Sequence, residues 1–267
     1  MSDLQRPTLH YEVHPGDGPH LLLVHGMLSG RSHWLPNLRA LREFTTPVVI
    51  ELFGHGRSPS PEQPERYHPD AYVEEFEAIR EAVGVARWFI CGQSLGASLT
   101  LRYALDRPER VIAQVWTNSA SAFPEEPWAE RIRPGMERQM ELIDELGHSV
   151  ISEHRLNPAR NPRLPDDLRE ALEADIALHS PRGFGMTGLH TLPYTSLRAR
   201  AGEITVPTLL ALGEREQRFH ESWHWAEQNI PQLEVAGLDA GHGVNIDDAE
   251  GFNEALRSFF GRFAAGE

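Results

Sequence analysis

The sequence of 267 residues is long enough for one large α/β domain, or for one domain with a sizeable insertion. Its formal net charge of −14 disfavours nucleic acid and anionic membranes as partners, because both bind basic patches. All 25 basic residues are arginines, which excludes Schiff-base chemistry, a pyridoxal site and a phosphate-binding Gly-Lys-Ser loop, because each needs a lysine amine.

The chain begins with MSDLQRPTLHYEVH, a polar segment of mixed charge that lacks the apolar core of a secretory signal peptide. The apolar run 21–24 that follows is far shorter than the roughly 20 residues of a transmembrane helix. The single cysteine, Cys91, excludes an internal disulfide and a cysteine-rich zinc site, and it fits a reducing compartment. We therefore expect a cytoplasmic protein with no membrane partner.

Four short apolar segments in the first half are predicted to be strands, at residues 20–26, 46–52, 87–92 and 111–117. They are apolar on both faces, as in a parallel sheet that is covered on both sides. Helices are predicted between them, because apolar residues recur at helical spacing over 72–83 and a run that starts with small residues spans 95–110. This alternation predicts a doubly wound, mostly parallel sheet with right-handed crossovers.

The alternation of strands and helices stops in the segment 119–200, which contains charged helical stretches and prolines. Strand-like runs return at 205–213 and 233–237, and a last helix follows. An all-helical insertion in such a framework is expected to cover the C-terminal edge of the sheet, where these folds bind ligands. We therefore predict a core of residues 1–118 and 201–267 that carries a helical cap of residues 119–200.

The segment Gly92-Gln93-Ser94-Leu95-Gly96 fits the pattern G-x-S-x-G at the point where a predicted strand turns into a helix. Its glycines allow the sharp turn and the close packing that lift Ser94 to the top of the sheet. A serine in this position is unreactive unless a base takes its proton and donors stabilise an oxyanion. Ser94 is therefore the candidate nucleophile, and its two kinds of partner can be sought elsewhere in the chain.

The candidate base is His242 in the segment DAGHGVN, which follows the last predicted strand. At the same edge of the sheet, His25-Gly26-Met27 ends the first predicted strand, and Gly26 allows a tight turn that leaves the Met27 N–H free. We predict that the N–H groups of Met27 and Leu95 form the oxyanion hole. His25 itself is expected to brace the loop by hydrogen bonding.

Five motifs of the chain occur together in an order and spacing that a known family shares: HGMLSGRSHW, LFGHGRS, GQSLGA, VPTLLALGERE and AGHGVNIDDAEGFNEALRSFF. They resemble the α/β-hydrolase superfamily, of the esterase, lactonase and C–C hydrolase kind. The resemblance covers both core segments but not the cap. It implies an α/β-hydrolase fold with the helical cap inserted after the sixth strand, and the chain order nucleophile, acid, histidine.

The acid that this order implies follows the next-to-last predicted strand, where the family usually has an aspartate. Here the position holds Glu216, whose longer side chain can still accept a hydrogen bond from the histidine and stabilise its charged form. Glu214 is the alternative acid, whereas Asp239 is expected to face away from His242. Some relatives place the acid after the strand that precedes the cap, but Asn118 stands there and is no carboxylate.

The segment HESWH at residues 220–224 fits the H-E-x-x-H pattern of zinc proteases. However, Phe219, Trp223, Ala226 and Ile230 recur at helical spacing, so the helix is predicted to bury that face against the sheet. The long form of the zinc motif is also broken, because Ile230 stands where a third histidine belongs. We therefore expect no metal and no cofactor.

The choice of substrate is expected to depend on the cap. Six cap residues are predicted to line the substrate pocket: Phe123, Trp128, Phe184, Met186, His190 and Tyr194. We predict a serine hydrolase, monomer or homodimer, that cleaves a small to medium, partly apolar carboxylic ester or lactone through an acyl-enzyme on Ser94. Two alternatives stay open, a C–C bond hydrolase of aromatic degradation and a hydrolase-like receptor with little turnover.

Overall fold

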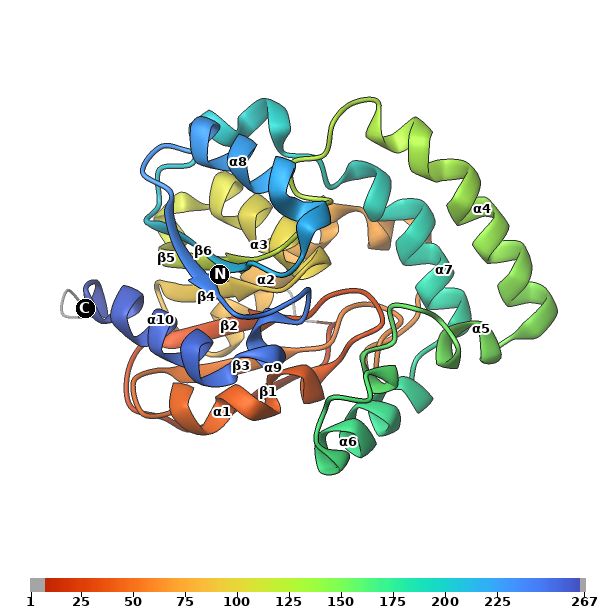
Figure 1. Cartoon of the computed structure of the whole chain (residues 1–267), viewed down its shortest axis with the longest axis horizontal. Coiled ribbons are helices and arrows are strands. Elements are labelled where there is room, and N and C mark those ends of the chain that lie inside the picture. The colour runs from red at the N-terminus through yellow and green to blue at the C-terminus, as the bar shows by residue number, and fades with distance from the viewer. Residues whose placement is uncertain (1–7, 265–267) are drawn as a thin grey trace, which may run out of the picture.

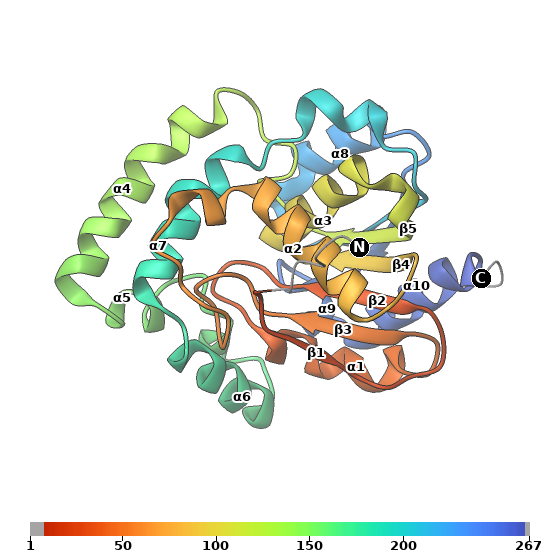
Figure 2. The same ribbon diagram turned by 180° about the vertical axis from the view of Figure 1, so that it is seen from behind.

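The computed structural model describes residues 8–264, and its centre is a seven-stranded sheet in the order β1-β3-β2-β4-β5-β6-β7. β1 pairs with β3 in antiparallel fashion, and all other neighbours are parallel. Helices cover both faces of the sheet (Figures 1 and 2). The strands are β1 (Tyr11–Val13), β2 (His20–Val24), β3 (Thr46–Ile50), β4 (Trp88–Gly92), β5 (Val111–Thr117), β6 (Thr208–Gly213) and β7 (Glu234–Leu238).

All the strands predicted from the sequence are present, with ends that differ by a few residues. β1 was not predicted, because its three residues are partly exposed and carry no apolar run. The helical insertion follows β5, and not the sixth strand that the family resemblance implied. Residues 8–264 contain one strand, β1, before β2, whereas an insertion after the sixth strand would require two strands before β2.

Successive residues of β2 belong to two different apolar layers, one on each face of the sheet. Leu22 and Val24 pack in the layer formed with α2, α3 and α8, and Leu21 and Leu23 pack in the layer formed with α1 and α10. Both faces are therefore buried, which explains the continuous apolar runs of the parallel strands. The helices outside the insertion are α1 (Leu35–Leu41), α2 (Pro69–Ala82), α3 (Leu95–Asp106), α8 (His220–Asn229), α9 (Val244–Asp247) and α10 (Ala249–Gly261).

The chain between β5 and β6 is helical. Its α-helices are α4 (Trp128–Leu146), α5 (Ser149–Ser152), α6 (Asp166–Ala177) and α7 (Pro181–His190). In both ribbon views they lie together at one end of the sheet, opposite the C-terminus (Figures 1 and 2). The insertion touches the loop after β3 closely, because a Cβ on Gly54 would lie 2.6 Å from the Gly183 Cα, and the Ser180 N–H donates to the Gly54 carbonyl at 2.9 Å. We call residues 119–200 the cap segment.

Within residues 8–264, no helix combines the length and the apolar character that are needed to span a bilayer. The expectation that the chain starts without a signal peptide concerns in part residues 1–7, which lie outside the described residues.

Two buried histidines hold the loop that follows β2. Each ring donates from Nδ1 to a backbone carbonyl, at 2.7 Å for His25 and 2.9 Å for His55. In return, the Nε2 of His25 accepts the Leu52 N–H at 3.0 Å, and the Nε2 of His55 accepts the Leu28 N–H at 3.2 Å. Burial lowers the pKa of His25 to about 3 and the pKa of His55 well below its ordinary value. Both rings are therefore neutral at neutral pH, and protonation would remove the acceptor that each offers.

We expect acid to destabilise the fold through these histidines. A histidine whose pKa is lower in the folded state binds fewer protons when folded, so the free energy of unfolding falls as the pH drops below about 6.5. Each ring contributes up to about 1.4 kcal/mol per pH unit. Urea unfolding of the wild type and His55→Gln between about pH 7.5 and pH 4.5 measures this loss. The glutamine can accept the Leu28 N–H but cannot titrate, so its slope should be shallower, and equal slopes would contradict the assignment.

Candidate active site

Ser94 lies at a strained turn between β4 and α3. Its φ of 53° is in the left-handed region that residues other than glycine rarely adopt. The helix approaches the sheet so closely that a Cβ on Gly96 would lie 2.2 Å from the Val24 carbonyl oxygen, and one on Gly92 would lie 2.4 Å from the Gly96 carbonyl oxygen. Glycine is therefore required at both positions. The turn leaves the Ser94 side chain partly exposed at the end of the sheet.

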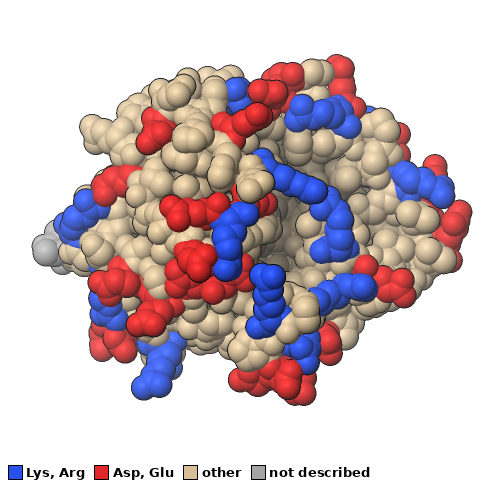
Figure 3. Space-filling view, in the orientation of Figure 1, with Lys and Arg blue, Asp and Glu red and all other residues tan. Residues whose placement is uncertain are grey.

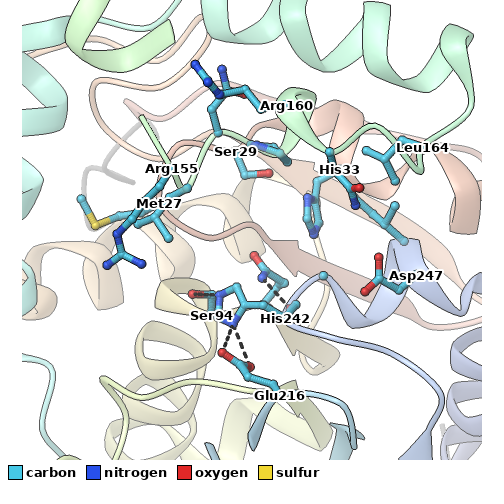
Figure 4. A pocket seen from close by; sticks show the side chains of 17 residues that line it. Met27, Ser29, His33, Ser94, Arg155, Arg160, Leu164, Glu216, His242 and Asp247 are labelled. Atoms are coloured by element: carbon cyan, nitrogen blue, oxygen red, sulfur yellow. Dashed lines mark hydrogen bonds and ion pairs between the residues drawn. The ribbon is translucent and has the colours of Figure 1, made fainter. Parts of the chain in front are cut away.

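The His242 ring connects Ser94 to a carboxylate. It belongs to the loop between β7 and α9, and its Nε2 lies 2.9 Å from the Ser94 Oγ. Its Nδ1 lies 3.0 Å from both carboxylate oxygens of Glu216 (Figure 4). Gln93 supports this loop, because its Nε2 donates to the His242 backbone carbonyl at 3.4 Å. A histidine held in this way can take a proton from the serine, while the carboxylate fixes the tautomer that carries a proton on Nδ1.

Of the acidic residues considered from the sequence, Glu216 is the one that faces His242. Burial raises the pKa of Glu216, but the hydrogen bonds from His242 and Asn118 and the charge of His242 outweigh it, so the pKa lies below its ordinary value. The carboxylate is therefore ionised at neutral pH. Glu214 lies against the backbone of β7 instead, and Asp239 is exposed on the surface.

Asn118, at the end of β5, holds Glu216 in place. Its Nδ2 donates to the Glu216 Oε2 at 2.9 Å and to the Gly213 carbonyl at 3.0 Å, and its Oδ1 accepts the Gly213 N–H at 2.9 Å. The side chain is fully buried. Asn118 was excluded as the acid because it is no carboxylate, and its contact with the acid was not predicted from the sequence. The available signal was its position, directly after a central strand at the edge where Ser94 and Glu216 also lie.

Met27 and Leu95 both belong to segments that meet at Ser94. Leu95 is the first residue of α3, so its N–H has no acceptor within the helix. The Met27 N–H forms no hydrogen bond with another residue of the described chain. The loop approaches the turn closely, since a Cβ on Gly26 would lie 2.9 Å from the Ser94 Cβ. Both N–H groups are therefore without a protein acceptor among residues 8–264, and the N-terminus of α3 adds about half a positive charge.

A cavity of about 470 Å³ opens over Ser94 and His242. It is visible as a hollow in the face shown in Figure 3. Outside the cap segment it is lined by Met27, Ser29, His33, Gln93, Ser94, Glu216, His242, Gly243, Ile246 and Asp247. The cap segment contributes Arg155, Leu156, Asn157, Pro158, Arg160, Asn161 and Leu164. The volume of the cavity is in the range of sites that bind small molecules.

The cap residues predicted to line the pocket do not border this cavity: Phe123, Trp128, Phe184, Met186, His190 and Tyr194. Phe123, Phe184 and Met186 are buried in the apolar packing of the molecule. His190 and Tyr194 border a separate depression beside α2. The part of the cap over Ser94 is instead the segment between α5 and α6, whose polar and irregular sequence carries no periodic signal.

The helix α8, which contains HESWH, packs against the core as predicted at Phe219, Ala226 and Ile230, which are buried, whereas Trp223 is only partly buried. His220 lies 3.2 Å from a backbone carbonyl, and His224 is exposed beside a glutamate. Among residues 8–264, no group of three or more histidine, cysteine, aspartate or glutamate side chains is placed to hold a metal ion.

Comparison with known proteins gives one family and several relatives. The family model described as alpha/beta hydrolase fold matches residues 19–249. The curated protein "Putative carbamate hydrolase RutD" of Stutzerimonas stutzeri is 27% identical over 264 residues, which cover 93% of this chain and 95% of that protein. Carboxylesterase YbfK of Bacillus subtilis is 23% identical over 249 residues, which cover 92% of this chain and 81% of that protein.

Among solved structures, MenH from S. aureus is similar with a TM-score of 0.83 and 18% sequence identity, over 95% of this chain and 98% of that chain. At this level of identity, the similarity shows the shared fold.

We expect Gly96→Ala to destabilise the protein and Gly135→Ala to stabilise it. A Cβ at residue 96 meets the Val24 backbone at 2.2 Å, whereas Gly135, within α4, has nothing within 4 Å of the added atom. Overpacking against a backbone that cannot move aside costs roughly 1–3 kcal/mol. Alanine in an open helical position adds roughly 0.5–1 kcal/mol. Denaturant unfolding measures both, and wild-type stability of Gly96→Ala would contradict the close approach of α3 to β2.

Proposed function

The chain belongs to the α/β-hydrolase family, and we propose that it is a serine hydrolase that cleaves a small to medium, partly apolar carboxylic ester or lactone. The observation that carries this proposal is the continuous series of hydrogen bonds from Ser94 through His242 to Glu216 at the floor of a cavity. The names of the curated relatives, a carbamate hydrolase and a carboxylesterase, support hydrolysis at a carbonyl carbon.

In the proposed reaction, the Ser94 Oγ attacks the carbonyl carbon while the His242 Nε2 takes its proton. The resulting oxyanion accepts hydrogen bonds from the N–H groups of Met27 and Leu95. When the tetrahedral intermediate collapses, the leaving alkoxide receives the proton from His242, and the acyl group stays on Ser94. Water then gives a proton to His242, attacks the acyl-enzyme and releases the acid, and Ser94 regains its proton.

Glu216 stabilises the charged form of His242 in both steps, because it is ionised and accepts the Nδ1–H. Asn118 acts as a positioning residue, since its donation to the Oε2 fixes the carboxylate in the plane that His242 needs. The apolar side chains of Leu156, Leu164 and Ile246 suit the partly apolar substrate. In this proposal, the core consists of residues 1–118 and 201–267, and the cap segment closes the cavity.

A C–C bond hydrolase is the second candidate, because Arg155 and Arg160 of the cap segment border the cavity. Such an enzyme would need a cation near the carboxylate or enolate of a vinylogous diketone. Cleavage of a diketone acid without turnover of any ester would replace the first proposal. A hydrolase-like receptor would release one equivalent of p-nitrophenol from an activated ester and then stop.

We expect the wild type to hydrolyse short and medium p-nitrophenyl esters, with or without a chelator, and Ser94→Ala to be inactive in both conditions. The reason is that the nucleophile is the Ser94 Oγ and the proposed reaction uses no metal. The loss in kcat should be roughly a factor of 10⁴ or more, as for the removal of a triad member. Activity that survives in Ser94→Ala, or disappears with the chelator, would refute the serine mechanism.

Asn118→Ala is expected to lower kcat while leaving KM close to the wild-type value. A hydrogen bond to a charged group is worth about 1.5–3 kcal/mol, so the loss in kcat should be roughly 10- to 100-fold. The rates are divided by the concentration of active sites, which is measured as the burst of p-nitrophenol, so that inactive molecules do not lower the kcat. Asn229→Ala is the matched control, because Asn229 is exposed and bonds only to a backbone carbonyl of α8. A variant with wild-type kcat per active site would mean that Asn118 does not position Glu216.

A further inference from the structure

Two arginines of the cap segment border the cavity over Ser94 without a protein partner. Arg155 and Arg160 line the cavity, and both side chains are exposed. Neither guanidinium forms a hydrogen bond or an ion pair with another residue in the range 8–264. Their position at the wall of the cavity distinguishes them from the other arginines of the chain.

The other charged or titratable side chains of the cavity are already compensated. Glu216 accepts the hydrogen bond from His242. Asp247 accepts a backbone N–H at 2.8 Å and lies 3.6 Å from the Arg215 guanidinium. Burial lowers the pKa of His33 to about 4, so this ring is neutral at neutral pH. The two arginines are therefore the charged groups of the cavity wall that lack a protein partner within residues 8–264, and both are positive.

The two arginines lie at different places in the cavity wall. In Figure 4, the Arg155 side chain lies on the same side as Met27, and Arg160 lies apart from it. Basic side chains also border the hollow in the space-filling view (Figure 3). An anion at Arg155 would thus lie on the side of the cavity where Met27 lies.

We propose that the substrate of this site carries a carboxylate, which Arg155 binds on the side of Met27 and which Arg160 attracts as the second cation of the cavity wall. This inference rests on the proposed hydrolase function and names its substrate class, an anionic ester or lactone. A guanidinium matches a carboxylate with two parallel hydrogen bonds. The carboxylate takes no part in bond making, and only the ester bond is cleaved.

The choice of a carboxylate, and not a phosphate, follows from the remaining wall. A phosphate group is usually held by several backbone N–H groups or by a cluster of cations. The rest of the cavity wall offers instead the apolar side chains of Leu156, Leu164 and Ile246. A single planar anion on a short carbon chain fits this combination.

Binding can be measured without turnover in the Ser94→Ala protein. The probes are monomethyl adipate, which carries one carboxylate, and dimethyl adipate, which has the same chain without charge. Calorimetric titration should give at least a tenfold lower Kd for the monomethyl ester, and Arg155→Gln in the Ser94→Ala background should remove that preference. Equal Kd values for the two probes would overturn the proposal. The result does not depend on catalysis, so it is separate from a failure of the proposed function.

Turnover provides the second test. Two pairs of esters are compared, and in each pair one compound has a free carboxylate and the other has this carboxylate converted to a methyl ester. The pairs are based on mono-p-nitrophenyl adipate and on 4-carboxyphenyl hexanoate. In at least one pair, the wild type should hydrolyse the compound with the free carboxylate with at least a tenfold higher kcat/KM. The first pair carries the charge in the acyl part, and the second carries it in the leaving group. Arg155→Gln should abolish the preference for the anionic ester, while Arg160→Gln should reduce this preference in part.

The matched control is Arg138→Gln, because Arg138 is a cap-segment arginine on α4 that is paired with Glu141 and lies outside the cavity wall. It should keep the full preference for the anionic ester. No preference in either pair of esters, or the same loss in Arg138→Gln as in Arg155→Gln, would refute the site. One outcome separates the two proposals. If the wild type hydrolyses neutral esters, Ser94→Ala does not, and anionic esters are not preferred, the anion site is refuted and the hydrolase proposal stands.

Discussion

The close approach of α3 to β2 is the constraint on which the candidate site depends. Because Gly96 has no side chain, the first turn of α3 can rest against the Val24 carbonyl, and Ser94 must then adopt its left-handed φ. The same contact brings the Leu95 N–H beside the loop that ends β2. The strain at Ser94, on the order of 1–3 kcal/mol, is held by the packing of the whole sheet. The position of Ser94 and that of the Leu95 N–H thus arise from one packing contact.

The histidines near this contact divide into two physical classes. His25 and His55 are completely buried and neutral, and they use both ring nitrogens to hold backbone groups. His242 is different, because 42% of its side chain is exposed and a carboxylate faces its Nδ1. Burial therefore fixes the loop that follows β2, whereas the His242 ring lies open to the cavity over Ser94.

The sequence predicts the parts of this molecule that depend on local pattern. The parallel strands, the turn at Ser94 and the position of His242 follow from apolar runs, glycine spacing and the order of motifs. Asn118 and Arg155 were missed, because their surroundings are made by segments far away in the sequence: Asn118 meets Glu216 across 98 positions. The apolar cap residues, such as Phe184, were expected in the pocket. An apolar helix face has the same sequence pattern whether it packs against protein or lines a cavity.

A strongly acidic protein with a cationic cavity raises an electrostatic question, because the net charge of −14 repels the anion that the cavity is proposed to bind. Screening resolves it: at physiological ionic strength the Debye length is about 8 Å, so distant carboxylates act weakly within the cavity, whereas Arg155 acts at contact. Hydrolysis then changes the balance. An ester that carries one carboxylate yields an acid with a second charge beside Ser94, close to the ionised Glu216. If the original carboxylate belongs to the acyl part, the product is a dianion near the ionised Glu216, and this repulsion favours departure of the product. The arginines therefore select the substrate, whereas Glu216 opposes retention of the acid.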